Sequence, residues 1–202
     1  MGNQKTLKKD FEISGKGLHT GLQITAHFLP APPHSGYKFI RTDLPDSPEI
    51  EALAENVQNT ERGTVLKNGD VSISTIEHAL AALYASQIDN CVIGINGPEM
   101  PILDGSSISF IDAINEAGIF EQDYDKQYYI VRNRIEVNDP DTGSSIIILP
   151  YDGFSITTLI SYDSCILNNQ FARLNNLDEF GKEIADSRTF VFASELKAIS
   201  ES

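Results

Sequence analysis

The period of the apolar residues changes once in the first half of the chain, and this change limits the possible folds more than any other feature. Residues 5–67 alternate in the period-two manner of β-strands, with turn-forming clusters between the runs. From Thr75 onward the period is helical, and one side of a helical wheel collects Ile76, Leu80, Leu83 and Tyr84. The first half therefore combines strands with amphipathic helices.

The turn clusters and apolar runs define the expected elements of this half. Strands are expected at residues 6–13, 22–29, 37–41 and 64–66, separated by GKG at 15–17, PAPPHSG at 30–36 and NGD at 68–70. After the helix that begins near Thr75, we expect a buried strand at 90–95. A second helix is expected at 108–117, which Gly118 would close at a C-cap position.

The second half of the sequence predicts fewer helices and strands than the first. The acidic stretch EQDYDK at 121–126 is interpreted as a linker, and the segments 128–137, 145–150 and 154–162 predict a three-stranded antiparallel meander. A further helix is expected at 175–185, followed by a partly helical segment at 187–202. The predicted domains are therefore 1–122, a linker at 123–126, and a partial second domain at 127–202.

The composition excludes several classes of protein. With 202 residues, 41% hydrophobic and 22% charged, the chain can bury a globular core. A net charge of -14 disfavours a broad nucleic-acid surface, although it leaves room for a basic pocket that binds one small anion. The sequence has neither a signal-peptide apolar region nor a membrane-length apolar run, so we expect a cytoplasmic protein. Cys91 and Cys165 are expected to be buried, reduced thiols.

The segment STIEHALAAL at 74–83 places Glu77 and His78 at the start of the first helix. Ser74-x-x-Glu77 matches a capping box, in which each side chain bonds the backbone amide of the other residue. His78 lies about 200° around the wheel from Ile76, on a face of alanines. From this stretch alone, a helix cap beside a solvent-facing histidine is the favoured interpretation.

A glutamate next to a histidine also suits a metal hydrolase. Catalytic zinc takes three protein ligands and a water, and a neighbouring carboxylate can accept a proton from that water. The sequence holds no HExxH pattern, and its cysteines have no CxxC partners. The other histidines, His19, His27 and His34, could approach His78 only through the fold. Spacing therefore leaves both interpretations open.

Three further segments carry candidate residues. GKGLHTG contains His19 between Gly17 and Gly21, which is typical of a β-turn with an exposed histidine. NGPEMPILDGSS contains Glu99, Asp104, Ser106 and Ser107, and its pattern predicts a turn followed by an N-cap. SRTF at 187–190 offers a hydroxyl that could stabilise an oxyanion, although a loop contact is the more frequent role.

Taken in order, these segments resemble a known family. GKGLHTG, RTDLP at 41–45, STIEHALAAL, IDNCVIGINGPEMPILDGSS at 88–107 and SRTF resemble UDP-3-O-acyl-N-acetylglucosamine deacetylase, the zinc amidase that commits precursors to lipid A synthesis. The resemblance runs from about Thr6 to the end of the chain. It implies an α+β fold of two similar two-layer domains, each a sheet covered by helices, with the active site between them.

The resemblance also implies roles for individual residues. His78 would be one of three zinc ligands, and Glu77 would be the base that deprotonates the zinc-bound water. Thr189 would donate a hydrogen bond to the developing oxyanion. Substrate contacts would come from Phe190, from Tyr162 on the uridine side, and from His19 in the cleft.

The chain departs from the family in its second domain. The family's other zinc ligands lie in an HKxxDxxGD motif, which this sequence lacks. One ligand cannot hold catalytic zinc. We therefore expect the full-length product to be the deacetylase and the 202-residue chain alone to be inactive. The alternative is a non-catalytic paralogue that binds a nucleotide-sugar or a protein. A gene that continues into a fused dehydratase domain is a third possibility.

Overall fold

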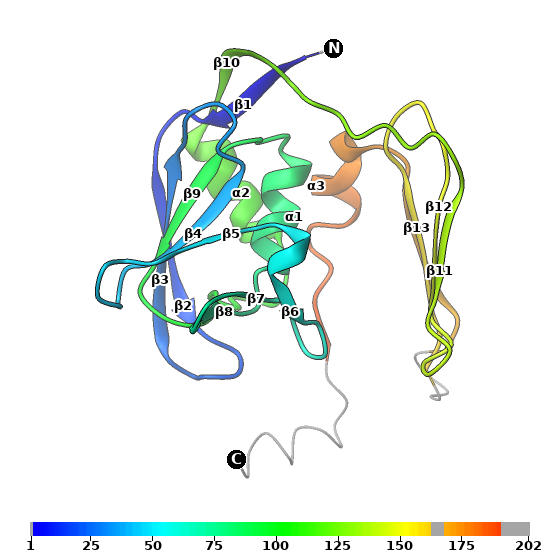
Figure 1. The fold of residues 1–202 in the computed structure, drawn as a ribbon, viewed down its shortest axis with the longest axis horizontal. Coiled ribbons are helices and arrows are strands. Elements are labelled where there is room, and N and C mark those ends of the chain that lie inside the picture. The colour runs from blue at the N-terminus through cyan, green and yellow to red at the C-terminus, as the bar shows by residue number, and fades with distance from the viewer. Residues whose placement is uncertain (1, 163–167, 191–202) are drawn as a thin grey trace.

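The computed structural model describes residues 2–162 and 168–190 (Figure 1). Its largest sheet has five strands in the order β2 (Phe11–Lys16), β3 (Gln23–Pro30), β9 (Cys91–Ile95), β4 (Tyr37–Arg41) and β5 (Glu49–Glu51). Neighbouring strands are antiparallel except β4 and β9, which are parallel. The strand predicted at 37–41 is confirmed, whereas the break predicted at 15–17 is displaced, because β2 continues to Lys16.

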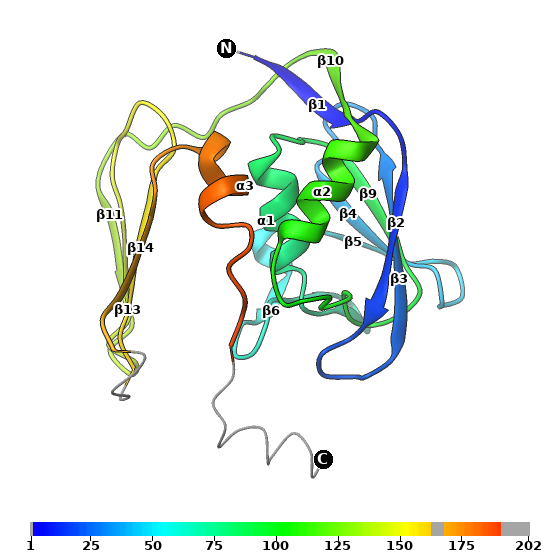
Figure 2. The same cartoon turned by 180° about the vertical axis from the view of Figure 1, so that it is seen from behind.

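Helices α1 (Glu77–Ala85) and α2 (Ile108–Ala117) cover one face of this sheet (Figures 1 and 2). The core lies between these layers, where the rings of Phe28 and Phe110 meet edge to face with centroids 6.0 Å apart. Alternate residues of β3 supply the sheet side of this core, as a strand with one buried face requires.

Both predicted helices are confirmed, and α2 ends where expected, with Gly118 at φ 74. The buried stripe of α1 differs from the prediction. Leu83 is buried, but Tyr84 is 50% exposed and Ala79 and Ala82 are buried in its place. The small alanines face the core because α1 also packs against α2, which leaves little room for large side chains.

A second sheet of three strands lies near the start of α1: β6 (Val57–Asn59), β7 (Val65–Asn68) and β8 (Val71–Ile73), preceded by the 3-10 turn η1 (Ala54–Asn56). Arg41 at the end of β4 connects the two sheets. Its buried guanidinium donates to the Ser72 carbonyl at 2.8 Å and pairs with Asp43 at 2.7 Å. This contact holds the small sheet beside the large one.

The stretch 121–126, predicted to be a linker, is largely strand. Strand β10 (Ile119–Asp125) pairs antiparallel with β1 (Asn3–Leu7). Gln122 turns inward, where its amide donates to the Ala31 carbonyl at 2.9 Å and accepts from Asn90 at 2.8 Å. The acidic residues on either side of Gln122 face solvent. The acidic composition therefore predicted the exposure of this segment correctly, but it gave no sign that the segment pairs with β1. The division into domains stays a prediction.

Beyond β10 the chain forms two hairpins that lie apart from the helices in Figure 1. Strand β11 (Ile135–Asn138) pairs with β12 (Ser145–Ile148), and β13 (Ile156–Ile160) pairs with β14 (Gln170–Leu174). The predicted three-stranded meander is therefore wrong, because the third strand pairs with a later segment. Alternation indicates which residues form a strand, but it does not choose the partner. The hairpins expose many large apolar residues, Val137 on β11 and Leu159 on β13 among them.

After β14 the chain returns to the helices through η2 (Leu177–Glu179) and α3 (Phe180–Glu183), which partly confirm the helix predicted at 175–185. Leu174, Phe180 and Ala185 join the same core as α1 and α2, and the Ser107 amide donates to the Ala185 carbonyl at 3.0 Å. The segment predicted to be partly helical at 187–202 lies mostly outside the described residues. The α+β class is confirmed.

Cys91 is buried and unbonded to sulfur, as predicted, and burial raises the pKa of its thiol to about 12. Cys165 lies outside the described residues. Within the part of the chain that the structure describes, the helices are too short or too polar to cross a membrane.

The return of the chain to the core predicts unequal roles for two phenylalanines. Phe180→Ala should lower the free energy of unfolding by about 3 kcal/mol, because it opens a cavity in the hydrophobic core that Phe180 shares with residues of α1 and α2. Phe171→Ala, on β14 with 65% of its surface exposed, should change it by less than about 0.5 kcal/mol. Urea denaturation of the 202-residue chain measures both, and equal losses would contradict the packing described.

Candidate functional site

Glu77 and His78 occupy the first turn of α1, and both are half-buried. The predicted capping box is wrong. The amide and hydroxyl of Ser74 both donate to the Pro98 carbonyl, at 3.0 and 3.3 Å, because Ser74 forms a bridge to the strand-like segment at Glu99. The Glu77 carboxylate instead accepts a hydrogen bond from the Thr64 amide at 2.9 Å. Its position is therefore set by the loop before β7.

The residue between Ser74 and the helix has an unusual backbone. Thr75 has φ 59 and is 3% exposed. Left-handed backbone is unfavourable for a β-branched residue and persists only where the surroundings enforce it. Here the Thr75 hydroxyl donates to Glu99 Oε1 at 3.2 Å. This turn sets the direction in which α1 starts.

Glu99 is fully buried and forms the centre of a hydrogen-bond cluster. Besides Thr75, its carboxylate accepts from the His19 amide at 2.9 Å, from the Thr20 amide at 2.9 Å and from the Thr20 hydroxyl at 2.8 Å. Burial alone would raise the pKa of this carboxyl, but the donors from His19 and Thr20 outweigh it and hold the pKa below its usual range. Glu99 is therefore ionised at neutral pH.

His19 is oriented from two sides. Its amide is held by Glu99, and its ring Nε2 lies 3.1 Å from the Arg62 carbonyl, so that nitrogen carries the proton. Gly17 makes this turn feasible, because a Cβ there would overlap the Glu99 carboxylate and the Thr20 hydroxyl. The glycines of GKGLHTG thus permit a backbone wrapped around a buried anion.

Thr189 lies on the segment that follows α3. Its amide donates to the Gly105 carbonyl at 2.8 Å, in the turn that precedes α2. Asp104 in that turn accepts from the Ser106 hydroxyl at 2.7 Å, which lowers the pKa of Asp104, and it lies 3.4 Å from Arg188. The sequence prediction of an Asp-Gly turn is confirmed, and the turn also anchors the C-terminal segment.

The structure brings the predicted site residues together in two groups. His19 and Glu77 both bond the loop at 62–64, through the Arg62 carbonyl and the Thr64 amide. Phe190 contacts Tyr162 edge to face, with ring centroids 5.5 Å apart, although 28 positions separate them in the sequence. Their roles toward a substrate stay predictions. Glu99 was missed as an organising residue, because no local pattern in the sequence indicates that its hydrogen-bond donors lie on the loop at 17–20 and at Thr75.

The described residues do not supply a complete metal site. Among them, no group of three or more His, Cys, Asp and Glu side chains is arranged to hold a metal ion. Catalytic zinc takes three protein ligands, so the donor set described here does not fit zinc by itself. His78 is a candidate for a single ligand.

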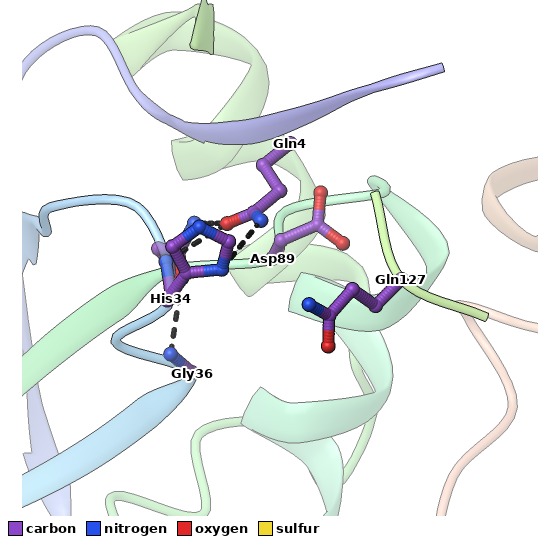
Figure 3. Close-up of a pocket in the computed structure, with 6 residues that line it drawn as sticks. Gln4, His34, Gly36, Asp89 and Gln127 are labelled. Carbon is purple, nitrogen blue, oxygen red and sulfur yellow. Dashed lines mark hydrogen bonds between the residues drawn. The ribbon is translucent and has the colours of Figure 1, made fainter. Parts of the chain in front are cut away.

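A polar pocket of about 220 Å³ lies at the other end of α1 and contains none of the predicted site residues (Figure 3). Gln4 and His34 line it and bond each other twice: the Gln4 side-chain amide lies 2.9 Å from His34 Nδ1, and its oxygen accepts from the His34 amide at 2.9 Å. Asn90 accepts from Gly36 at 3.0 Å. These mutual bonds give the pocket a structural role beneath β1 and β10.

Comparisons with known proteins extend over nearly the whole chain. Residues 4–202 match the family model described as UDP-3-O-acyl N-acetylglycosamine deacetylase. A bifunctional enzyme LpxC/FabZ of Bacteroides thetaiotaomicron is 53% identical over 98% of this chain and 43% of its own length. A UDP-3-O-acyl-N-acetylglucosamine deacetylase of Bdellovibrio bacteriovorus is 38% identical over 97% of this chain and 65% of its own length. The chain thus spans less than half of the bifunctional relative and about two thirds of the deacetylase.

The buried carboxylate predicts a pH dependence of stability. Because the pKa of Glu99 is lowered from its ordinary value of 4.5 in the folded protein, its charge stabilises the fold above that value. This contribution is lost as the pH falls through the folded-state pKa. The difference in free energy of unfolding between the wild type and Glu99→Gln should therefore be largest above about pH 5 and shrink at lower pH. Urea titrations at several pH values measure it, and a pH-independent difference would contradict the assignment.

Proposed function

The chain belongs to the UDP-3-O-acyl N-acetylglycosamine deacetylase family, and from this membership we propose that the protein containing it hydrolyses the 2-acetamido group of UDP-3-O-acyl-N-acetylglucosamine. Acetate is released and a free amine remains, which is the committed step of lipid A biosynthesis. We assign this activity to a cytoplasmic enzyme. Because the chain covers less than half of the bifunctional relatives, the activity is proposed for the longer protein.

The geometry of Glu77 carries this proposal. One carboxylate oxygen is occupied by the Thr64 amide, so the side chain is fixed while it remains half-buried rather than enclosed. A glutamate held in this way suits a general base. Glu77 takes a proton from the attacking water while the water oxygen forms a bond to the acetamide carbon. The carbon–nitrogen bond then breaks as the proton held by Glu77 passes to the leaving nitrogen, which gives acetate and the free amine.

The remaining residues are proposed to position and stabilise the reacting group. The Thr189 hydroxyl donates to the oxyanion of the tetrahedral intermediate, and the bond from its amide to Gly105 supports a fixed place for it. Phe190 and Tyr162, which are 46% and 38% exposed, offer an aromatic surface to the substrate. His19, whose ring is ordered by the Arg62 carbonyl, is proposed to contact the substrate.

We propose zinc as the cofactor of the longer protein, with His78 as one ligand. The described residues do not complete such a site, so the other ligands come from elsewhere in the protein. The 202-residue chain alone is accordingly proposed to be inactive. The exposed apolar hairpins β11–β12 and β13–β14 support a second domain that is incomplete in this chain. The names of the bifunctional relatives support a fused dehydratase domain downstream.

Zinc content and turnover of two proteins test the proposed function. The longer gene product should bind one zinc and release acetate from UDP-3-O-acyl-N-acetylglucosamine, whereas the 202-residue chain should do neither. Metal analysis after dialysis and an acetate assay measure both. Tight one-to-one zinc with turnover in the short chain would refute its proposed inactivity. A longer protein that binds the nucleotide-sugar without turnover would favour the non-catalytic alternative.

The oxyanion role of Thr189 predicts a contrast between two substitutions in the longer protein. Thr189→Val removes the hydroxyl and should lower kcat by about 100-fold, as loss of an oxyanion donor does elsewhere. Thr189→Ser keeps the hydroxyl and should retain most of the rate. Steady-state kinetics measure both variants, and equal activity in the two would show that the hydroxyl is not used.

A further inference from the structure

The two segments that carry His19 and Glu77 are joined through one buried carboxylate. Glu99 receives two donors from Thr20 and one from the His19 amide, all on the loop between β2 and β3. It receives another from the Thr75 hydroxyl, at the start of α1. The side chain of Glu99 is fully buried, so it cannot touch a substrate itself. Any effect on chemistry must pass through the residues that it holds.

The link to Glu77 runs through the backbone of Thr75. This residue has φ 59, a left-handed conformation that is unfavourable for a β-branched residue. Its hydroxyl bond to Glu99 favours that conformation over the alternatives. Two residues later comes Glu77, and then His78. A change of backbone angle at Thr75 would rotate the first turn of α1 and displace both side chains.

The link to His19 closes a ring of contacts. From Glu99 the chain of bonds passes through the His19 amide and ring to the Arg62 carbonyl. Two residues on, the Thr64 amide donates to Glu77, whose helix start leads back through Thr75 to Glu99. Gly63 lies inside this ring, where a Cβ would sit 3.4 Å from the Glu77 carboxylate. Because the contacts form a closed ring, a displacement of Glu99 or Thr75 also displaces the residues bonded to them.

We propose that Glu99 is a positioning residue for the deacetylation, because it fixes the left-handed turn at Thr75 and the His19 loop and thereby aims Glu77 and His78. This inference rests on the proposed function for its catalytic meaning. Its geometric content, that Glu99 controls the place of the Glu77 carboxylate, is independent of the reaction.

Four variants separate positioning from general stability. Glu99→Gln keeps the shape but faces the donors with a neutral amide, and Thr75→Val removes the hydroxyl while keeping the branched shape. Thr75→Ser restores the hydroxyl and serves as the rescue. Thr6→Val is the matched control, because Thr6 is also a buried threonine, with its hydroxyl bonded to the Asn90 carbonyl at 2.7 Å, remote from α1's first turn.

The first readout needs no activity. In NMR spectra of the 202-residue chain, the Thr64 amide proton reports its bond to the Glu77 carboxylate, and the His78 ring signals report the start of α1. Glu99→Gln and Thr75→Val should shift these signals toward those of Glu77→Gln, whereas Thr75→Ser and Thr6→Val should leave them in place. Unmoved Thr64 and His78 signals in folded Glu99→Gln or Thr75→Val would overturn the proposal.

The second readout is kinetic and uses the longer protein. Glu99→Gln and Thr75→Val should lower kcat by about 10- to 100-fold, the effect of misplacing a catalytic group by about 1 Å, with KM changed by less than about twofold. Thr75→Ser should recover the rate. If Glu99→Gln does not fold, the Thr75 pair decides the test. If the wild-type longer protein shows no deacetylation, the proposed function fails, while the NMR result still decides the positioning role.

Discussion

The buried carboxylate of Glu99 is the interaction on which the rest of the candidate site depends. An ionised group away from water is costly unless it is fully hydrogen-bonded. Glu99 receives four donor groups, from His19, Thr20 and Thr75. Bonds to a charged acceptor contribute about 1.5–3 kcal/mol each, which is enough in sum to keep the carboxylate ionised and its donors in place. The loop, the left-handed turn and the start of α1 are therefore fixed together.

Much of the fold could be predicted from local periodicity. Helix α2 and strand β4 fall where the apolar spacing indicated, and α1 begins at Glu77, two residues after the predicted start near Thr75. Pairing could not be predicted in this way. Strand β10 contains acidic residues that suggest a solvent-exposed linker, whereas in the fold it pairs with β1 and turns Gln122 inward. Strand β13 pairs with β14, although the connection from β13 to β14 is longer than the one from β12 to β13.

In the candidate site, too, sequence motifs indicated individual residues but not their hydrogen-bond partners. Motifs indicated His19, Glu77 and Thr189, but the capping box drawn from Ser74 and Glu77 was wrong. The Ser74 hydroxyl donates to the carbonyl of Pro98, 24 positions later in the chain. The Glu77 carboxylate accepts from the amide of Thr64, 13 positions earlier. The sequence places Glu99 in a turn-rich loop, and nothing local to it shows that its hydrogen-bond partners come from the loop at 17–20 and from Thr75. Such partners are visible only once the chain is folded.

We propose that Glu77 and His78 form the first half of a zinc hydrolase site whose geometry is set by Glu99. Anomalous X-ray scattering at the zinc edge, recorded from crystals of the longer protein, tests this most directly. We expect a zinc peak about 2.1 Å from a ring nitrogen of His78, with the Glu77 carboxylate turned toward the metal. A zinc peak bound by other residues, with His78 directed away from it, would contradict the assignment of His78 as a zinc ligand.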